Sequence, residues 1–478
     1  MTSLPAGAPV GVVGAGAMGV GIAQVAAAAG HPVQIFDVSP EAAERGRQRL
    51  ADSLAAQISR GRMERAEADS LLDRVVVTST LDSLATCRLV IEAIYEDPAA
   101  KLEVFQQLEP DLEADAIICS NTSSLSISQL GGGLARPERF AGFHFFNPAP
   151  AMKLVEVVAG LATSDGTIDT LMESARAWGK VPVRARSTPG FIVNRIARPF
   201  YAEALALVEE GLEPATIDEV MRRGGGFRMG PCELMDLIGH DVNYAVTSSV
   251  FTATYNDPRF RPSVVQRELV HAGWTGQKAG RGFYTYPRTH SPADVQPEAA
   301  VPAAQVLPGV GLDGPASVDG TEIARSDGRS ALRREADTGS PCIVFDLFGA
   351  HDADLLGYAR SPSVPPPLVD RFEATVRERG LHPVELPDTP GLLVLRTVAM
   401  IVNEAFDAVH LRVTNESDAD LAMVHGVNYP QGPLGWGRAI GLDSIVAVID
   451  NLHAETGDPR YRCSMRLRRE AVANTVPV

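Results

Sequence analysis

The sequence predicts an α/β protein, with an N-terminal doubly wound sheet of the Rossmann type followed by an all-helical domain that is duplicated at the C-terminus. Short apolar strands alternate with helices over residues 1–185, which is typical of a parallel sheet covered by helices on both faces. From Gly190 to about Phe283 the pattern is helical. A segment that begins at Asp388 repeats the start of this helical part.

Short apolar runs mark the strands of the first domain. Helices are expected at Met18–Ala29, Pro40–Arg62 and Thr167–Trp178. Ser39 and Pro40 indicate a helix start, because serine caps free backbone amides and proline suits the first helical position. The expected strands are Val10–Val13, Val33–Phe36, Val75–Thr78, Leu89–Ala93, Ile117–Ser120, Phe140–Phe145, Leu154–Val158 and Val181–Arg184.

The helical repeat can be followed residue by residue. TPGFIVNR begins at Thr188, and TPGLLVLR begins at Thr389. Matches that continue at a constant spacing indicate a duplicated domain. Asn194 of the first copy is matched by Leu395 in the second. The repeat therefore predicts a copied fold but not copied chemistry.

The region between the two helical copies differs in composition. Pro287–Gly328 is rich in proline, alanine, glycine and serine, which predicts a loop or linker. An expected strand at Cys342–Phe348, a helix at Val369–Arg379 and a strand at Val384–Leu386 form a small, degenerate α/β segment. The predicted regions are a Rossmann domain (1–187), a helical domain (188–286), the linker with the degenerate segment (287–387) and the second helical copy (388–478).

Two helical copies on one chain can cover each other's apolar faces. We expect residues 190–285 to contact residues 390–470 about a pseudo-twofold axis. The second copy is expected to act as a non-catalytic scaffold. A homo-oligomer of the whole chain remains possible.

Charge and composition limit the partners. The net charge of −16 at pH 7 repels nucleic acid and anionic membranes, so neither is an expected partner. The N-terminus has no basic region followed by an apolar one, so no signal peptide is expected. Five cysteines lie far apart without a CxxC pair, which favours free thiols in a reducing cytoplasm and no metal site.

A glycine-rich turn follows the first expected strand and opens the first expected helix. The turn predicts a dinucleotide site, because its glycines allow a tight turn, a close approach of the pyrophosphate and close helix–strand packing. Asp37 ends the second expected strand, where a carboxylate binds ribose hydroxyls and repels a 2′-phosphate. The cofactor expected is therefore NAD, bound at Gly14, Ala15, Gly16, Ala17, Met18, Gly19 and Asp37.

His144 and Glu156 lie twelve residues apart on two consecutive expected strands. A carboxylate on one imidazole nitrogen fixes the tautomer and leaves the other nitrogen free to accept a proton. A purely structural histidine is the alternative. Ser123 and Asn194 are candidates to hold a reacting oxygen, although a helix cap and a solvated helix position explain them equally well.

These motifs together identify a family. GAGAMG from Gly14 with Asp37, SNTSSLSI from Ser120, HFFNPAPAMKLVEVV from His144 and TPGFIVNR from Thr188 closely resemble the L-3-hydroxyacyl-CoA dehydrogenases. The duplicated helical domain is similar to the long bacterial form, which includes 3-hydroxyadipyl-CoA and 3-hydroxybutyryl-CoA dehydrogenases. The resemblance implies NAD-dependent oxidation of (3S)-3-hydroxyacyl-CoA to 3-oxoacyl-CoA by hydride transfer, in fatty-acid β-oxidation or phenylacetate degradation.

The resemblance also implies residue roles. His144 would be the general base and Glu156 its partner, with Ser123 and Asn194 at the oxygen functions of the substrate. Further cofactor contacts would be Glu96, Lys101, Ser123, Asn147 and Lys278, and the CoA part of the substrate would meet Ser53 and Arg60, beside Ser123 and Asn194 at the acyl end.

The positive potential that an anionic CoA needs must be local. Arginines cluster in and just after the second expected helix, and they would face the CoA phosphates or form a solvated face with i,i+4 pairs. Two other functions remain open: a dehydrogenase of free hydroxy acids, of the gulonate dehydrogenase or lambda-crystallin type, and a non-catalytic nucleotide-binding protein. The clustered arginines are Arg45, Arg47, Arg49, Arg60, Arg62 and Arg65.

Overall fold

The computed structural model describes residues 3–288, 307, 315–347, 349 and 353–475. Within it the chain divides into two compact units. The first unit contains Met1–Asn194 and Leu411–Val427, and the second contains Arg195–His410 and Asn428–Val478. None of the helices in the described part of the chain is long and apolar enough to cross a membrane.

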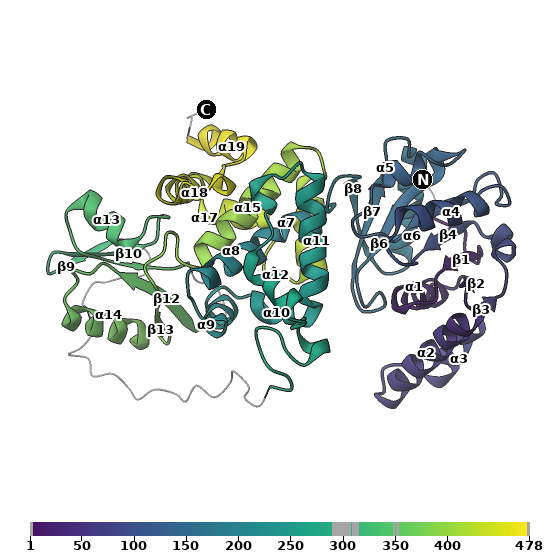
Figure 1. The fold of residues 1–478 in the computed structure, drawn as a ribbon, viewed down its shortest axis with the longest axis horizontal. Helices are drawn as coiled ribbons and strands as arrows, with labels where there is room; N and C mark the ends of the chain where they lie inside the picture. The colour runs from purple at the N-terminus through teal and green to yellow at the C-terminus, as the bar shows by residue number, and fades with distance from the viewer. Residues whose placement is uncertain (1–2, 289–306, 308–314, 348, 350–352, 476–478) are drawn as a thin grey trace. The chain divides into compact units, whose positions relative to one another are not determined.

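The first unit is built on an eight-stranded sheet with the order β3-β2-β1-β4-β5-β6-β7-β8 (Figure 1). The expected Rossmann-type sheet is confirmed. The sheet is not wholly parallel, because β7 pairs antiparallel to β6 and β8 runs parallel to β7. The loop between β6 and β7, residues 146–153, is too short for the crossover that parallel strands need. The strands are β1 (Val10–Val13), β2 (Val33–Phe36), β3 (Val75–Thr78), β4 (Leu89–Glu92), β5 (Ile117–Ser120), β6 (Phe140–Phe145), β7 (Leu154–Ala159) and β8 (Val181–Arg186).

Helices cover this sheet. Ser39 caps the second helix as expected, since its hydroxyl accepts a hydrogen bond from the Ala42 amide. That helix ends at Ser59, three residues before the expected end, and a further helix that the analysis of the sequence did not foresee follows it. The helices are α1 (Ala17–Ala28), α2 (Pro40–Ser59), α3 (Arg65–Asp73), α4 (Pro98–Leu108), α5 (Ile127–Gly131), α6 (Asp165–Ala177) and α16 (Glu416–Val427), with short 3-10 turns at Leu81–Thr86 and Pro137–Arg139.

The helix α16 comes from the second repeat but belongs to the first unit. It packs against β7 and β8. The Asp418 carboxylate accepts a hydrogen bond from the Arg184 amide at 2.9 Å. A side chain at Gly426 would collide with Leu154, so this glycine allows the helix to lie close to the sheet. A helix from the C-terminal part of the chain therefore completes the unit that the N-terminal part forms.

The second unit contains both helical copies. The segment between Asn194 and the first copy's end at residue 286 is helical as expected. Its helices are α8 (Arg198–Glu209), α9 (Pro214–Glu219), α10 (Pro231–Ile238), α11 (His240–Ala253) and α12 (Val264–His271), with a π-turn at Val220–Gly224 and 3-10 turns at Pro258–Phe260 and Gln277–Ala279; the short α7 (Val193–Ile196) precedes them. The second copy contributes α15 (Val394–His410), α17 (Pro433–Ile440), α18 (Leu442–Thr456), α19 (Met465–Thr475) and a 3-10 turn at Pro459–Tyr461.

The helices α8 and α15 pack together through reciprocal ion pairs. Arg195 Nε lies 2.6 Å from Glu404 Oε1, and Arg396 Nε lies 2.6 Å from Glu203 Oε2. All four side chains are buried. The arginine of each copy thus binds the glutamate of the other, which is the contact pattern of an isologous, twofold-related interface.

A second sheet, with the order β13-β12-β11-β10-β9, lies in the same unit (Figure 1). Its presence partly corrects the expected loop Pro287–Gly328, because β9 and β10 fall inside it. The sequence does not predict these strands because they are short and lack an apolar run. The strand β10 is held by parallel pairing with β11, which comes later in the chain. Residues 289–306 and 308–314 of that loop lie outside the described residues. The sheet consists of β9 (Ala316–Val318), β10 (Thr321–Arg325), β11 (Cys342–Phe345), β12 (Leu355–Arg360) and β13 (His382–Glu385), with helices α13 (Ala331–Thr338) and α14 (Pro366–Glu378).

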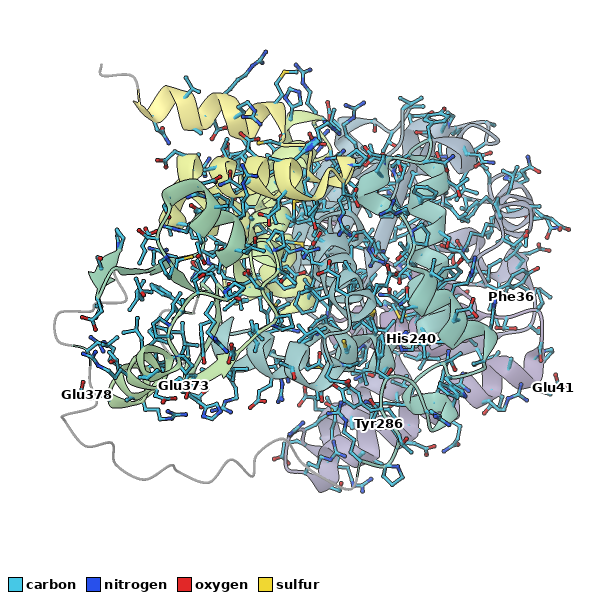
Figure 2. All side chains as sticks on the ribbon, turned by 60° about the vertical axis from the view of Figure 1, so that its left-hand side comes forward. Phe36, Glu41, His240, Tyr286, Glu373 and Glu378 are labelled. Carbon is cyan, nitrogen blue, oxygen red and sulfur yellow. The ribbon has the colours of Figure 1, made fainter. Side chains whose placement is uncertain are left out.

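A buried carboxylate ties the end of the first helical copy to its centre. Asp236 accepts hydrogen bonds from His240 Nε2 at 2.7 Å, from the Phe283 amide at 2.9 Å and from the Tyr286 hydroxyl at 2.9 Å. His240 and Tyr286 are labelled in Figure 2. Burial opposes ionisation of Asp236, but these donors hold its pKa below the ordinary value. The segment that follows α12 is therefore anchored to α10 by a charged group.

Candidate active site

The glycine turn between β1 and α1 has the shape that a dinucleotide needs. Gly14 has a φ of +105°, and a side chain there would collide with the Ala93 carbonyl oxygen. A side chain at Gly19 would overlap the Gly14 carbonyl. At Gly16, by contrast, a Cβ would meet no atom within 4 Å, and no side chain caps α1. The free amides at the start of α1 and the open space beside Gly16 fit the pyrophosphate of a dinucleotide.

Asp37 follows β2 beside this turn. Its carboxylate accepts hydrogen bonds from the Ala15 amide at 2.9 Å and from the Ser39 amide at 3.0 Å. Arg49 on α2 also reaches the turn and donates to the Ala15 carbonyl. A Cβ at Gly46 would lie 3.0 Å from that same carbonyl oxygen, so a glycine is needed for α2 to pack here. Arg49 is a neighbour of the turn that reasoning from the sequence placed only in the arginine cluster.

His144 and Glu156 face each other directly across β6 and β7. His144 Nδ1 lies 2.7 Å from Glu156 Oε2, and the two residues are 6% and 1% exposed. The other carboxylate oxygen, Oε1, accepts the Ile192 amide at 2.9 Å and the Val193 amide at 3.0 Å. The carboxylate is therefore held from both sides, and Nε2 is the ring nitrogen of His144 that does not face it.

Ser123 and Asn194 lie next to each other in the first unit. Asn194 Nδ2 donates to the Ser123 carbonyl at 3.4 Å, and Asn194 directly follows the two residues whose amides bind Glu156. The cap of α5 is Ser126, whose hydroxyl accepts the Gln129 amide. Ser123 therefore does not act as the helix cap, and both side chains are only half-buried.

An ionic network supports the loop that carries Ser123. Lys101 Nζ lies 2.6 Å from Glu92 Oε1 and 3.2 Å from Glu96 Oε2. Glu96 also accepts the Ser123 amide at 3.2 Å and the Thr122 hydroxyl at 2.5 Å. Burial opposes its ionisation, but Thr122 and Lys101 lower the pKa of Glu96, so it is an anion beside Ser123.

Two residues of this region were missed by reasoning from the sequence. Glu92 is fully buried at the end of β4, where it binds Lys101 and accepts the Ser120 hydroxyl at 2.6 Å. The sequence signal that could have identified Glu92 is an acidic residue at the end of an apolar strand. Lys180 donates to the carbonyls of Ala149 at 2.6 Å and Met152 at 2.8 Å, and so holds the loop after His144. Burial lowers the pKa of Lys180 to about 8.

Four predicted residues lie at the surface. Ser53 and Arg60 are exposed, one within α2 and the other at its C-terminal cap. Asn147 is exposed in the loop after β6. Lys278 belongs to the second unit, where its ammonium group lies 2.7 Å from an Asp241 carboxylate oxygen. Their roles toward cofactor and substrate stay predictions.

Comparisons with known proteins agree with this arrangement. Residues 9–188 match the model of the 3-hydroxyacyl-CoA dehydrogenase NAD-binding domain. Residues 190–286 and 391–475 both match the model of the C-terminal domain of the same enzymes. The 3-hydroxyadipyl-CoA dehydrogenase of Escherichia coli K12 is 41% identical over 97% of each chain. This chain belongs to the 3-hydroxyacyl-CoA dehydrogenase family.

Other members of the family cover either the whole chain or its first part. A crystal structure titled 3-hydroxybutyryl-CoA dehydrogenase, from Escherichia coli K12, superimposes with a TM-score of 0.93 at 40% identity and covers 98% of both chains. The probable 3-hydroxybutyryl-CoA dehydrogenase of Bacillus subtilis is 44% identical, and its match covers 58% of this chain and 96% of that one. Residues 323–390 match the model of a 3-hydroxybutyryl-CoA dehydrogenase reduced Rossmann-fold domain. The degenerate α/β segment is thus a recognised part of the family.

The second repeat of this dehydrogenase has no imidazole at the position of His144. In the second, five-stranded sheet, the Asp346 amide donates to the Gly357 carbonyl at 2.8 Å, just beyond the paired residues of β11 and β12. The Asp346 carboxylate accepts three backbone amides at the start of α15, from Leu393 at 3.0 Å, Val394 at 2.7 Å and Leu395 at 2.8 Å. The contact between a carboxylate and the helix start is kept, while the imidazole that could accept a proton is absent.

Proposed function

We propose that this dehydrogenase oxidises the 3-hydroxyl of a (3S)-3-hydroxyacyl-CoA to the 3-oxoacyl-CoA, with NAD as the acceptor and His144 as the general base. The observation that carries the proposal is the 2.7 Å contact between His144 Nδ1 and Glu156 Oε2. Ser123 and Asn194 lie together in the same unit. A purely structural histidine has no need of this set of polar side chains.

The proton of the hydroxyl group goes to His144 Nε2. Glu156 accepts a hydrogen bond from the Nδ1–H group of His144, and this bond keeps the Nε2 lone pair available. When the imidazolium forms, the neighbouring carboxylate stabilises its charge. The amides of Ile192 and Val193 prevent the carboxylate from turning away. In the reverse direction the imidazolium returns the proton to the oxygen.

The side chains of Ser123 and Asn194 hold the reacting oxygen functions of the substrate. Ser123 Oγ and Asn194 Nδ2 can both donate hydrogen bonds to an oxygen that gains negative charge as its proton leaves. Both side chains are half-buried, so they are reachable yet largely removed from water.

NAD would be held mainly by the glycine turn and the residues around it. The start of α1 binds the pyrophosphate, and Asp37 binds the ribose hydroxyls and disfavours a 2′-phosphate. NAD bound there would supply the hydride acceptor for the carbinol carbon of the substrate. The remaining proposed contacts are Gly14, Ala15, Gly16, Ala17, Met18, Gly19, Glu96, Lys101, Ser123, Asn147 and Lys278.

The CoA part of the substrate would meet Ser53 and Arg60 on α2. Both side chains are exposed, and an arginine binds phosphate through two donors. Relatives similar to this chain carry names with two different acyl groups, hydroxyadipyl and hydroxybutyryl. Fatty-acid oxidation and the degradation of aromatic acids are the processes that such substrates serve. Four of the five free cysteines are buried, in keeping with a reducing cytoplasm.

His144→Gln tests the base. Positioned general bases contribute ~10²–10⁴-fold, so kcat for 3-hydroxybutyryl-CoA should fall by about that factor, measured as NADH absorbance. NAD binding, measured by calorimetry on the same variant, should be retained. Turnover close to that of the unaltered protein would remove His144 from the mechanism.

The substrate class needs a separate comparison. The CoA thioester should be oxidised with NAD, whereas free 3-hydroxybutyrate and NADP should support little turnover. Faster oxidation of the free acid would favour a hydroxy-acid dehydrogenase. Absence of turnover with every thioester would favour a non-catalytic nucleotide-binding protein.

A further inference from the structure

Arg198 is a buried cation that forms no ion pair with any acid among the described residues. Five arginines in the described part of the chain are buried: Arg195, Arg198, Arg259, Arg334 and Arg396. Four of them form ion pairs with aspartate or glutamate. Arg198, which is 5% exposed, donates only to the Thr247 hydroxyl at 2.7 Å, and its Nε has no hydrogen-bond partner among the described residues.

The surroundings of Arg198 do not neutralise its charge. Its guanidinium lies 4.9 Å from the centre of the Tyr201 ring. Burial lowers the pKa of Arg198. An arginine nevertheless stays protonated in proteins. Burying such a charge without a counter-ion is unfavourable, so an anionic ligand that binds beside Arg198 would be stabilised by it.

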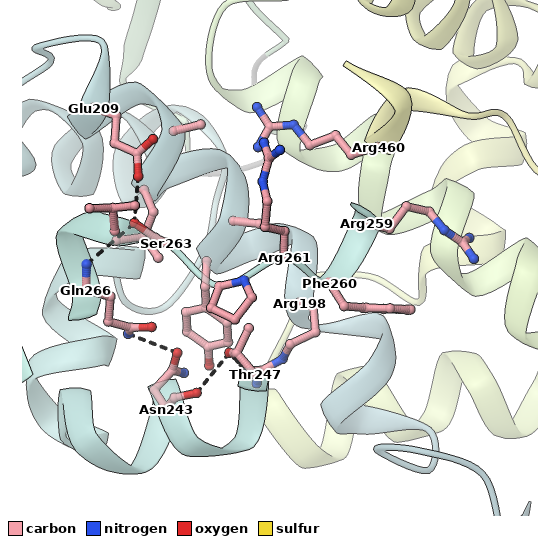
Figure 3. A pocket seen from close by; sticks show the side chains of 16 residues that line it. Arg198, Glu209, Asn243, Thr247, Arg259, Phe260, Arg261, Ser263, Gln266 and Arg460 are labelled. Atoms are coloured by element: carbon pink, nitrogen blue, oxygen red, sulfur yellow. Dashed lines mark hydrogen bonds between the residues drawn. The ribbon is translucent and has the colours of Figure 1, made fainter. Parts of the chain in front are cut away.

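Arg198 lines a cavity of about 340 Å³ in the second unit. The cavity lies between α8, α11 and the turn that leads into α12, and Figure 3 shows Arg198 next to Thr247 on its wall. Asn243, Ser263 and Arg261 add polar groups to the lining. Glu209 is the single acid among the lining residues, and it is exposed and accepts the Ser263 hydroxyl at 2.8 Å.

The other arginines of the lining are already paired. Arg259 binds Asp257, Glu404 and Asp407, and in Figure 3 its guanidinium points away from Ser263 and Gln266. Arg261 lies 3.0 Å from an Asp458 oxygen. Arg460 lies 3.6 Å from Asp458 and 3.9 Å from Glu203. An anion that enters the cavity would therefore find its free cationic partner in Arg198.

The repeat shows that the helix does not need this arginine in order to pack. Arg195 and Glu203 correspond to Arg396 and Glu404, so the position of Arg198 in the second copy is occupied by Ala399. Ala399 is fully buried in α15. The same helix in the same fold thus accepts a small apolar residue where the first copy buries a charge, which favours a binding role for Arg198.

We propose that the cavity at Arg198 binds a carboxylate group of a short dicarboxylic chain. The planar guanidinium pairs with the two oxygens of a carboxylate, and the volume suits a small organic acid. The ligand is a free dicarboxylic acid, so the site is independent of the proposed function.

Binding is measured on the full chain with adipate at constant ionic strength. Adipate should raise the Tm of the unaltered protein, and Arg198→Met should weaken adipate binding about 10- to 100-fold. Arg267→Met is the matched control, because Arg267 is an exposed arginine on α12 outside the cavity lining. Without adipate, Arg198→Met should be at least as stable as the unaltered chain, since it removes an unpaired buried charge.

A kinetic control separates this site from the proposed function. In Arg198→Met, adipate binding should be lost while KM for 3-hydroxybutyryl-CoA stays unchanged. Loss of all turnover in the unaltered chain would count against the proposed function and leave the adipate measurement intact.

Two results would overturn the carboxylate site. In one, adipate neither stabilises the unaltered chain nor binds to it. In the other, inorganic phosphate stabilises the chain through Arg198 while adipate does not, which would identify a phosphate site.

Discussion

Asp346 holds, in the second repeat, the strand position that His144 holds in the first. His144 pairs with Glu156 across β6 and β7, and Asp346 pairs with Gly357 across β11 and β12. In the first repeat the carboxylate that caps the following helix comes from Glu156 on the second strand of the pair; in the second repeat it comes from the first strand. Both repeats thus have a carboxylate bound to the start of the following helix, but only the first has an imidazole beside it.

Asp346→Ala tests this structural role. The substitution leaves three buried backbone amides without an acceptor, and each such group costs about 1–3 kcal/mol. We expect the free energy of unfolding of the full chain to fall by about 3 kcal/mol or more, measured by urea denaturation. The kcat of the folded fraction should stay within about twofold, because the copy supplies no proton acceptor. A fall in kcat as large as that of His144→Gln would contradict a purely structural copy.

Glu156→Gln tests the proposed partner of the base. The amide can still accept the Ile192 and Val193 amides, but its nitrogen donates to His144 Nδ1 and favours the tautomer that carries a proton on Nε2. We expect kcat to fall ~10²-fold or more. NAD affinity and Tm serve as controls, and a kcat equal to that of the unaltered enzyme would exclude Glu156 from the mechanism.

Removing one member of a buried ion pair should be costly. Arg396→Met leaves the Glu203 carboxylate buried with weaker partners, which should lower the free energy of unfolding by about 3–5 kcal/mol. The double variant with Glu203→Leu should be more stable than Arg396→Met alone. Arg176→Gln breaks an exposed pair with Glu173 and should change stability by less than about 1 kcal/mol. Equal effects of the two arginine substitutions would contradict a buried α8–α15 contact.

The stability should depend on pH through Asp218. Burial raises the pKa of Asp218 to about 6, although the Tyr284 hydroxyl and two backbone amides oppose the rise. The folded state then holds more protons than the unfolded state between pH 4 and 6, so this group's contribution to stability falls as the pH rises through that window.

Asp218→Asn removes that contribution and isolates it. Measured by urea unfolding, the stability of the Asn variant relative to the unaltered chain should rise between pH 4 and pH 6, by at most about 3 kcal/mol, and then stay constant. Burial also raises the pKa of Asp346 to about 6. This residue is present in both proteins, so its contribution cancels in the difference between their free energies of unfolding. A difference that does not change with pH would show that Asp218 has an ordinary pKa.

The local features of the fold could be predicted from the sequence. The glycine turn, the capped start of α2 and the strand pairs that carry His144 and Glu156 depend on neighbouring residues, and short-range sterics leave few alternatives. The repeat could be aligned residue by residue for the same reason. The strand β10 could not be predicted, because its partner β11 lies later in the chain and its own sequence is polar.

By itself, the sequence determined the Rossmann-type sheet, the duplicated helical domain, the family and the candidate dyad, since periodicity, glycine positions and motif spacing are written in it directly. Tertiary structure alone decided what Glu156 does with its second oxygen, which strand supplies the cap of α15, and which buried arginine lacks a carboxylate. Each of these depends on groups tens to hundreds of residues apart in sequence being brought within hydrogen-bond distance. Whether a buried charge is compensated is a property of its surroundings in space, and no local pattern records it.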